Sequence, residues 1–346
     1  MHLADCFDLP AGYVAVPYTG PDDLPEMLGS LIAHRDRAGL DERPTLDQMR
    51  STYAHLTDCD PDRDIALFRT TSGEPVGYTR ASHDDLESGV RDCVVFVPIR
   101  PEHLDQPMFD AVVVGIERHM ADRAAAVDHA RFRAYATHPG PGLPATDDAA
   151  WLEQLGYVAT EWGASLRRPH LDDVPDLPLP DGVEVRPVTP DQVRHILEVH
   201  HEAFRGEWDF HEASTAEIEQ MIDDPLTDPT LWQVAWAGDQ VVGQVKPFIN
   251  AEENADRGYL RGYTEYISTH RDWRNRGIAS ALLARSLVVL RERGMTEAVL
   301  GVDTNNPGGA FHVYTRLGFE LRTYEAVYTK PIVAAGDPVP PQGLEP

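Results

Sequence analysis

A segment rich in proline and aspartate divides the chain near its middle, and the same order of sequence patterns occurs on both sides of it. The segment spans residues 167–182 and reads RRPHLDDVPDLPLPDG. It has no periodic apolar face, and its prolines favour an extended backbone. On each side a short apolar strand pattern comes first, followed by a proline-containing turn and a stretch of helical apolar periodicity. The chain is therefore predicted to fold as two units of the same kind.

Three short matches support a duplicated unit. They recur in the same order, at offsets between 162 and 169 residues: Val14 with Val183, Val76-Gly77 with Val242-Gly243, and Leu155-Gly156-Tyr157 with Leu317-Gly318-Phe319. Small loop deletions after a duplication produce a slow drift of this kind. A length of 346 residues also suits two domains. We expect a first unit over 1–168, a linker over 169–182, a second unit over 183–330 and a mobile tail over 331–346.

The second half mixes strand and helix patterns. Strands are predicted near 231–237, 241–249, 259–269, 297–303 and 321–329, and helices near 277–293 and 308–317. The order is an antiparallel meander followed by a strand–helix–strand crossover. This order predicts an α+β fold with α/β-type layers.

Charge and cysteine content exclude several classes of protein. Thirty Lys plus Arg stand against 57 Asp plus Glu, which gives a formal net charge of -27. Because a phosphate backbone needs a basic footprint, no nucleic-acid partner is expected, and cationic or neutral partners are favoured. Solubility alone is the competing explanation of this charge. The three cysteines are too few and too scattered for a disulfide framework, and no spacing of ligands predicts a metal.

The sequence also carries no pattern for export or for a membrane. The first residues, MHLADCFDLPAG, lack the basic and apolar regions of a signal peptide, and no apolar run approaches ~20 residues. We expect a cytoplasmic protein, monomer or homodimer, without a membrane partner.

The stretch R-N-R-G-I-A lies between a predicted strand ending at Thr269 and an amphipathic helix starting near Gly277. A glycine at this junction lets the backbone approach a ligand, and the first-turn N–H groups of the helix have no intrahelical partner. Together with the helix dipole they favour a phosphate or diphosphate, and Arg274 and Arg276 supply positive charge. A plain loop with surface arginines is the alternative for this glycine alone, since neither a Walker loop nor a dinucleotide motif is present.

A second stretch, DTNNPGGAFHVYTRLGF at 303–319, follows the next predicted strand. Asn305 and Asn306 offer side-chain amides, a Pro-Gly-Gly turn follows, and a short helix presents Tyr314. A buried tyrosine whose hydroxyl bonds to backbone is the competing interpretation of Tyr314.

Together, R-N-R-G-I-A and N-N-P-G-G-A-x-x-x-Y-x-x-L-G-F resemble two motifs of the GNAT superfamily of acyl-CoA-dependent N-acetyltransferases. The resemblance covers residues 183–330 well and the first half only in its framework. The tandem arrangement is similar to that of the mycothiol synthase family and its actinobacterial relatives. This resemblance implies two tandem GNAT-like domains, each with a mixed, mostly antiparallel central sheet flanked by helices. It also implies a splay between the fourth and fifth strands that holds the pantetheine of acyl-CoA.

The resemblance assigns roles to individual residues. Diphosphate contacts fall on the backbone of Arg274, Asn275, Arg276, Gly277, Ile278, Ala279 and Ser280, and pantetheine contacts fall on Ile267, Ser268 and Thr269. Asn306 matches the asparagine that steadies the cofactor, with a register uncertain by one because Asn305 precedes it. Tyr314 matches the general acid that protonates the departing thiolate, and a strand N–H stabilises the oxyanion.

The general base is left open by these motifs. Attack on a thioester requires a neutral amine, so a base or a low amine pKa is needed. Glu265, expected on the same strand face as Ile267 and Thr269, is the first candidate. The alternatives are His200, His201 and His270, since histidine titrates near neutral pH. An ordinary surface or core role is the competing interpretation of each.

The first half departs from the motifs. After Val97 it reads P-I-R-P-E-H-L-D-Q-P, with no glycine and with prolines where free amides would be needed. Leu152 occupies the place that matches Tyr314. We expect this half to be catalytically silent and to shape the acceptor cleft.

The resulting prediction is direct transfer of an acetyl group from acetyl-CoA to a primary amine of a small, cationic metabolite or antibiotic-like acceptor. Polyamines, aminoglycoside-like or peptide antibiotics and mycothiol-type cysteinyl glycosides are candidate acceptors, and Trp208-Asp209-Phe210 is a candidate lining. A non-catalytic acyl-CoA-binding sensor and a protein N-terminal acetyltransferase are the alternatives.

Overall fold

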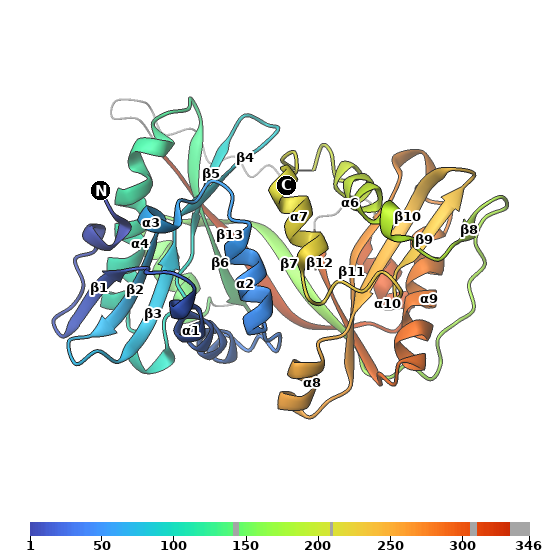
Figure 1. The fold of residues 1–346 in the computed structure, drawn as a ribbon, viewed down its shortest axis with the longest axis horizontal. Coiled ribbons are helices and arrows are strands. Elements are labelled where there is room, and N and C mark those ends of the chain that lie inside the picture. Colours follow the sequence, from blue (N-terminus) through green and yellow to red (C-terminus); the bar gives the residue numbers. More distant parts are fainter. Residues whose placement is uncertain (141–144, 208–209, 305–309, 333–346) are drawn as a thin grey trace.

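The two halves of the chain lie side by side and share strands of one sheet (Figure 1). The computed structural model describes residues 1–140, 145–207, 210–304 and 310–332. None of the described helices combines the length and apolar composition that a membrane crossing requires. The helices and strands of the first half are β1 (Tyr13–Pro17), α1 (Leu24–Arg37), α2 (Leu46–Ala54), α3 (Pro61–Asp64), β2 (Ile65–Thr70), β3 (Pro75–Arg80), β4 (Ser82–Asp85), β5 (Arg91–Val95), α4 (Gln106–Ala124), β6 (Ala130–His138), α5 (Asp147–Gln154) and β7 (Val158–Arg168).

The second half follows the predicted order of helices and strands. Its elements are β8 (Glu184–Val185), α6 (Val193–Glu202), α7 (Thr215–Asp223), β9 (Gln233–Ala237), β10 (Gln240–Phe248), α8 (Ala251–Arg257), β11 (Arg261–Thr269), α9 (Ile278–Glu292), β12 (Glu297–Asp303), α10 (Ala310–Arg316) and β13 (Glu320–Pro331). Helix α7 lies where no helix was expected, and so does α8. Asn250 caps it by accepting the N–H of Glu253 at 3.0 Å, and Gly258 ends it in a left-handed conformation.

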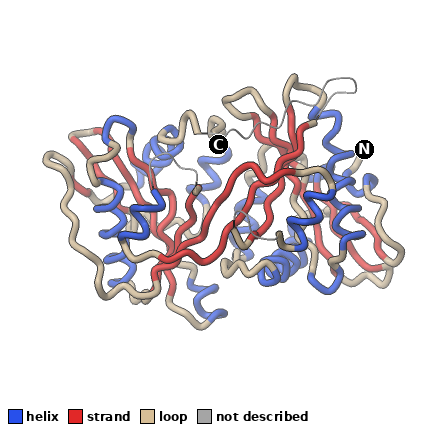
Figure 2. The backbone as a smooth tube through the Cα atoms, turned by 180° about the vertical axis from the view of Figure 1, so that it is seen from behind, coloured by secondary structure: helices blue, strands red, loops and turns tan. Residues whose placement is uncertain are grey.

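The predicted α+β layers are confirmed, and the sheet is continuous across both halves. A three-stranded sheet has the order β1-β2-β3, and a ten-stranded sheet has the order β4-β5-β6-β13-β7-β12-β11-β10-β9-β8. Strand β7 of the first half therefore lies between β12 and β13 of the second. Strand β13 in turn lies between β6 and β7 of the first half, and the long central strands are visible from behind in Figure 2.

The exchanged strands also contribute to the hydrophobic cores of the two halves. Leu166 of β7 and Leu171 of the linker are buried in the core of the second half, against α9 and β12. Ala326 and Tyr328 of β13 are buried in the core of the first half, against α4 and β6. Each half thus completes its core with a strand from the other.

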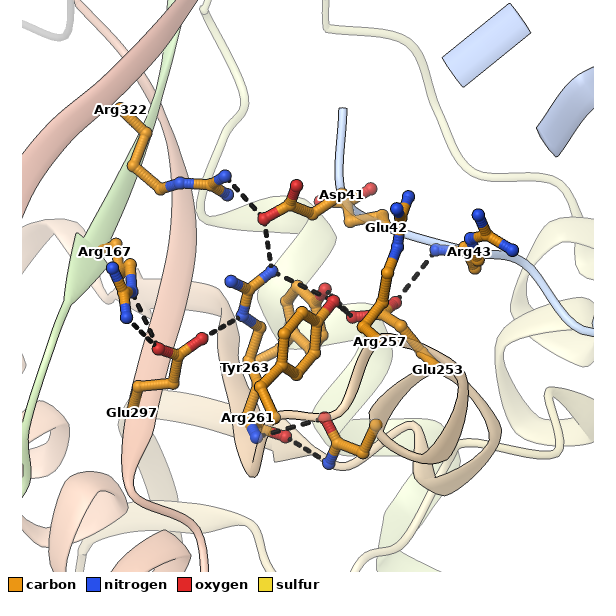
Figure 3. A network of polar contacts seen from close by, with 12 residues as sticks. Asp41, Glu42, Arg43, Arg167, Glu253, Arg257, Arg261, Tyr263, Glu297 and Arg322 are labelled. Atoms are coloured by element: carbon orange, nitrogen blue, oxygen red, sulfur yellow. Dashed lines mark hydrogen bonds and ion pairs between the residues drawn. The ribbon is translucent and has the colours of Figure 1, made fainter. Parts of the chain in front are cut away.

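A buried polar network joins a first-half loop to the second half (Figure 3). Arg261 of β11 is 3% exposed, and its guanidinium donates to Glu297 at 2.7 Å and to Asp41 at 3.0 Å. Glu253 of α8 accepts the backbone N–H of Arg43 at 2.9 Å and the hydroxyl of Tyr263 at 2.6 Å. The loop between α1 and α2 is therefore fixed on both sides of Glu42.

We predict that the second half depends on β7. A fragment of residues 171–332 lacks the strand that separates β12 from β13, so both strands lose hydrogen-bonding partners. A fragment of residues 157–332 restores that strand and is the matched control. We expect a cooperative thermal transition, followed by circular dichroism, for 157–332 and none for 171–332. Equal, cooperative melting of the two fragments would contradict this dependence.

We also predict a large stability cost for Arg261→Met. The substitution leaves buried Glu297 and the Asp41 carboxylate without this guanidinium, which costs about 3 kcal/mol of unfolding free energy. Arg257→Met removes a more exposed partner of Asp36 and is the control, with an expected cost below about 1 kcal/mol. Urea unfolding of both variants measures the difference; equal costs would show that the Arg261 network contributes little.

Candidate active site

Strands β11 and β12 pair only at their first three positions and then diverge. The paired residues are Arg261 with Glu297, Gly262 with Ala298, and Tyr263 with Val299. Beyond them, the N–H of Gly301 donates to Oε1 of Glu265 at 2.9 Å. A carboxylate thus takes the place of a strand carbonyl, which satisfies an amide that the splay would leave unpaired.

A bulge in β11 redirects the side chains after Glu265. Tyr266 has a φ of +51°, which is strained for an aromatic residue, and the partners on β10 shift from Lys246 opposite Glu265 to Gln244 opposite Ser268. Because Lys246 and Gln244 are two residues apart, Glu265 and Ser268 share a face. The prediction that Glu265, Ile267 and Thr269 share one strand face is therefore wrong, because the alternation of side chains between the two faces breaks at Tyr266.

A cavity of about 410 Å³, here called the cofactor cavity, opens beside this splay. Nine of the residues predicted to contact acetyl-CoA, together with the predicted acid, line it: Ile267, Ser268, Thr269, Arg274, Asn275, Gly277, Ile278, Ala279, Ser280 and Tyr314. The sequence reasoning did not anticipate the other six lining residues: Ala203, Phe204, Glu207, Trp273, Val313 and Arg316. Asn305 and Asn306 lie outside the described residues.

The start of α9 presents open backbone amides to the cofactor cavity. Gly277 is the N-cap residue, with a φ of +81° and no side-chain cap, so the N–H groups of Ile278, Ala279 and Ser280 are available to an anion. The two predicted arginines differ. Arg274 donates to the carbonyl of Ala203 at 2.8 Å and to that of Thr269 at 3.4 Å. Arg276 stacks on Trp273 and does not line the cavity.

Tyr314 of α10 is 6% exposed and lines the cofactor cavity. Burial and the charge of Glu265 raise the pKa of its hydroxyl well above the usual value. The phenol is therefore protonated at neutral pH, as a proton donor must be.

The pKa of Glu265 is raised to about 8, by burial and by the nearby charge of Glu42, against a smaller lowering by the Gly301 N–H. Glu42 belongs to the loop held by the Figure 3 network. A carboxyl group with this pKa takes up a proton near neutral pH far more readily than an ordinary glutamate.

The three histidines considered as bases have other contacts. Nδ1 of His200 lies 3.1 Å from Oγ of Ser268, and burial together with the charge of Lys246 holds the His200 pKa well below its usual value. His201 contacts the carbonyl of His211, and Nδ1 of His270 accepts the N–H of Asp272 at 3.3 Å. None of the three lines the cofactor cavity.

Lys246 is a residue that the sequence reasoning did not place at the site. It is 2% exposed, lies opposite Glu265 on β10, and sits over the rings of Tyr266 and Trp232. Among the described residues its Nζ has no hydrogen-bond partner, and burial lowers its pKa to about 7. The sequence offered one indication of its importance: Lys246 is one of only two lysines in the chain.

A second cavity of about 430 Å³, here called the acidic cavity, lies over the exchanged strands. Gly301 lines it, so the partner of Glu265 belongs to its wall. Its lining includes four carboxylate residues and two aromatic residues: Glu42, Glu161, Asp303, Glu325, Tyr135 and Trp162. Glu265 itself lines neither of these two cavities, but its strand neighbours line the cofactor cavity and its hydrogen-bond partner lines the acidic cavity.

Of the residues predicted to line the acceptor cleft, Trp208-Asp209-Phe210, the structure describes only the last. Trp208 and Asp209 lie outside the described residues. Phe210 is 5% exposed, lies under the guanidinium of Arg205, and lines neither cavity. The contacts described for Phe210 are thus packing contacts.

At the corresponding place in the first half, the start of α4 presents no comparable set of open amides. The side chain of Asp105 caps α4 and accepts the N–H of Met108 at 2.9 Å, and Pro107 removes a further donor. Leu152, at the place of Tyr314, is 1% exposed in the core. These contacts explain in structural terms why the first half is expected to be silent.

Comparison with known proteins agrees with this geometry. The family model described as "Acetyltransferase (GNAT) family" matches residues 193–319. A mycothiol acetyltransferase of Clavibacter michiganensis subsp. michiganensis is 24% identical over 314 residues, 89% of this chain and 93% of the relative. A mycothiol acetyltransferase of Cellulomonas flavigena is 27% identical over 334 residues, 94% of this chain and 89% of the relative.

Two solved structures share the fold over nearly the whole chain. A GCN5-related N-acetyltransferase from Sphaerobacter thermophilus aligns with a TM-score of 0.67 at 21% identity, over 93% of this chain and 96% of that chain. A tandem GNAT protein from the clavulanic acid biosynthesis pathway aligns with a TM-score of 0.64 at 14% identity, over 92% and 98%. Residues 193–319 of the chain therefore match the GNAT acetyltransferase family, and the chain as a whole has the fold of GNAT proteins, including a tandem one.

Proposed function

We propose that this protein transfers the acetyl group of acetyl-CoA to a primary amine of a small, cationic acceptor. The observation that carries the proposal is the position of Glu265 beside residues that line two cavities. Its strand neighbours line the cofactor cavity, which also contains Tyr314, and its partner Gly301 lines the acidic cavity. A base and an acid thus lie where an amine from one side meets a thioester from the other.

The residues of the cofactor cavity fit acetyl-CoA. The three open amides at the start of α9 suit a diphosphate, and the diverging strands leave backbone groups of Ile267 to Thr269 beside the cavity. One of these strand N–H groups is the proposed donor to the oxyanion. Acetyl-CoA supplies the activated acyl group, and the chain's residues position it and move protons.

Glu265 is the proposed general base. An ammonium must lose a proton before it attacks the thioester carbonyl, and the carboxylate of Glu265 accepts that proton. The Gly301 N–H holds the carboxylate in place, while Glu42 keeps its proton affinity high. Below pH 8 most of Glu265 is protonated in the free enzyme, and a bound cation favours the ionised form.

Tyr314 is the proposed general acid, and its proton affinity is coupled to Glu265. The ionised carboxylate raises the Tyr314 pKa. When Glu265 takes the proton of the amine, this repulsion ends and the phenol becomes a stronger acid. The proton is therefore released most easily when the departing thiolate needs it.

The acidic cavity supports a cationic acceptor. Burial raises the pKa of Glu325, Arg35 lowers it, and Glu42 adds a smaller rise, because the two carboxylates repel each other. An ammonium group between them relieves this repulsion. The relatives named mycothiol acetyltransferases, 24% to 27% identical, make a mycothiol-type cysteinyl glycoside a specific acceptor to include beside polyamines and aminoglycosides.

We predict that Tyr314→Phe lowers kcat by about 100-fold or more while CoA still binds. Loss of a general acid slows proton transfer by this order, whereas the cavity keeps its shape. Thiol release from acetyl-CoA over a panel of amines measures kcat, and calorimetry measures CoA binding. Tyr13→Phe, in the first half, is the matched control. CoA binding without thiol release with any amine, in the unsubstituted protein, would instead indicate a sensor.

We predict that kcat/KM rises with pH along a limb that is half-maximal near pH 8 and levels above it, because Glu265 must be ionised to act as a base. Glu265→Gln keeps an acceptor for the Gly301 N–H but removes this limb and lowers kcat/KM by about 100-fold. Glu42→Gln removes a negative neighbour, so the Glu265 pKa falls and the limb moves to lower pH. Retention of the limb in Glu265→Gln would assign the base elsewhere.

A further inference from the structure

A third cavity, of about 360 Å³, lies in the first half and is here called the first-half cavity. It is built from the same parts as the cofactor cavity. The end of α1, the end of β5, the start of α4 and helix α5 contribute to it, as the residues directly after α6, strand β11, the start of α9 and helix α10 do in the second half. Leu152 of α5 lines it in the place of Tyr314. It is therefore the first half's counterpart of an acyl-CoA slot.

This cavity does not suit the diphosphate of CoA. The Asp105 carboxylate occupies the start of α4, and Pro107 provides no N–H there. A second carboxylate, Asp148, lies in the cavity wall, paired with Arg37. Arg35 and Arg80 also line this cavity, but a diphosphate lacks here the open helix-start amides that α9 offers, so a different ligand class must be considered.

Much of the wall is apolar. The residues that give it this character are Leu31, Val95, Val97, Phe109, Ala134 and Ala136. Polar residues also line it, among them Arg35, Arg80, Asp148 and His34. Burial and the charges of Arg37 and Arg35 lower the pKa of His34 to about 4, so its ring is neutral. Among the described residues its Nδ1 has no hydrogen-bond partner although the atom is buried. An unpaired polar atom in an apolar wall is costly unless a ligand or water satisfies it.

The first-half cavity adjoins the acidic cavity. Four residues line both: Arg35, Leu40, Tyr135 and Glu325. A molecule whose ammonium group lies near Glu325 therefore has the apolar wall within reach on the other side of these side chains. The adjacency singles out the acceptor, and not a separate ligand, as the occupant.

We propose that the first-half cavity binds an uncharged, mostly apolar tail of the amine acceptor, whose ammonium end lies in the acidic cavity. The proposal rests on the proposed function, because it extends the acceptor site. It predicts an amphiphilic amine, with one hydrogen-bonding atom of the tail near His34. The former cofactor slot of the first half thus determines acceptor length.

A homologous series of amines tests the tail site. The probes are 1,3-diaminopropanes carrying one N-methyl, N-propyl or N-hexyl group. Burial of each methylene raises kcat/KM by up to about fourfold, so the hexyl probe is expected to exceed the methyl probe by more than 10-fold. Ala38, at the end of α1, lines the cavity, and Ala38→Trp should remove this gain while leaving the methyl probe unchanged. The control Ala121→Trp, on the exposed side of α4, should retain it.

Calorimetry with the same probes, in the presence of CoA, separates the tail site from turnover. Binding that strengthens with chain length and is lost in Ala38→Trp, but without acetyl transfer, supports the tail site and contradicts the proposed function. Transfer to all probes at equal kcat/KM supports the function and overturns the tail site. Two CoA molecules bound per chain would also overturn it, because the first-half cavity would then be a second cofactor site. Both tryptophan variants must melt like the unsubstituted protein.

Discussion

Strand β7 hydrogen-bonds to β12 along one edge and to β13 along the other, although it belongs to the first half of the chain. The reciprocal placement of β13 between β6 and β7 makes the exchange symmetric. Everything that we assign to the acceptor depends on it, because β6, β7, β12 and β13 all contribute residues to the acidic cavity. A chain with the same motifs and separate sheets would have no cavity of this composition.

The chemistry depends on how two strands separate. Because β11 and β12 diverge, the N–H of Gly301 donates to the carboxylate of Glu265 and not to a strand carbonyl. The bulge at Tyr266 turns Ile267 and Thr269 toward the face opposite Glu265. In the proposed reaction, strand residues on the two sides of the bulge serve different ligands: the base serves the amine, and the backbone serves the thioester. The first half contributes through Glu42, whose loop is fixed by Asp41 and Arg43. Its charge raises the proton affinity of Glu265, which then influences Tyr314.

Most of the residues assigned from the sequence motifs line one cavity, because the determinants of that part of the fold are local. A glycine at a helix start, and a tyrosine on the short helix that follows the next strand, are fixed by neighbouring residues, and both line the cavity. The strand exchange was not predictable, because β7 and β13 have apolar patterns that suit either neighbour. The bulge at Tyr266 depends on register with β10, which alternation alone does not reveal. The contribution of Glu42 depends on contacts between residues more than 200 positions apart.

Part of the excess negative charge behind the net charge of -27 is concentrated in the acidic cavity. Carboxylates gather over the exchanged strands, whereas the cofactor cavity is bordered by backbone amides and arginines. The most direct test is a crystal structure with CoA joined through an acetyl bridge to one amine of a polyamine. The account predicts the diphosphate at the start of α9, the bridge between Glu265 and Tyr314, and the polyamine in the acidic cavity. A polyamine chain that leaves the bridge on the other side of the sheet, away from Glu265 and Gly301, would contradict it.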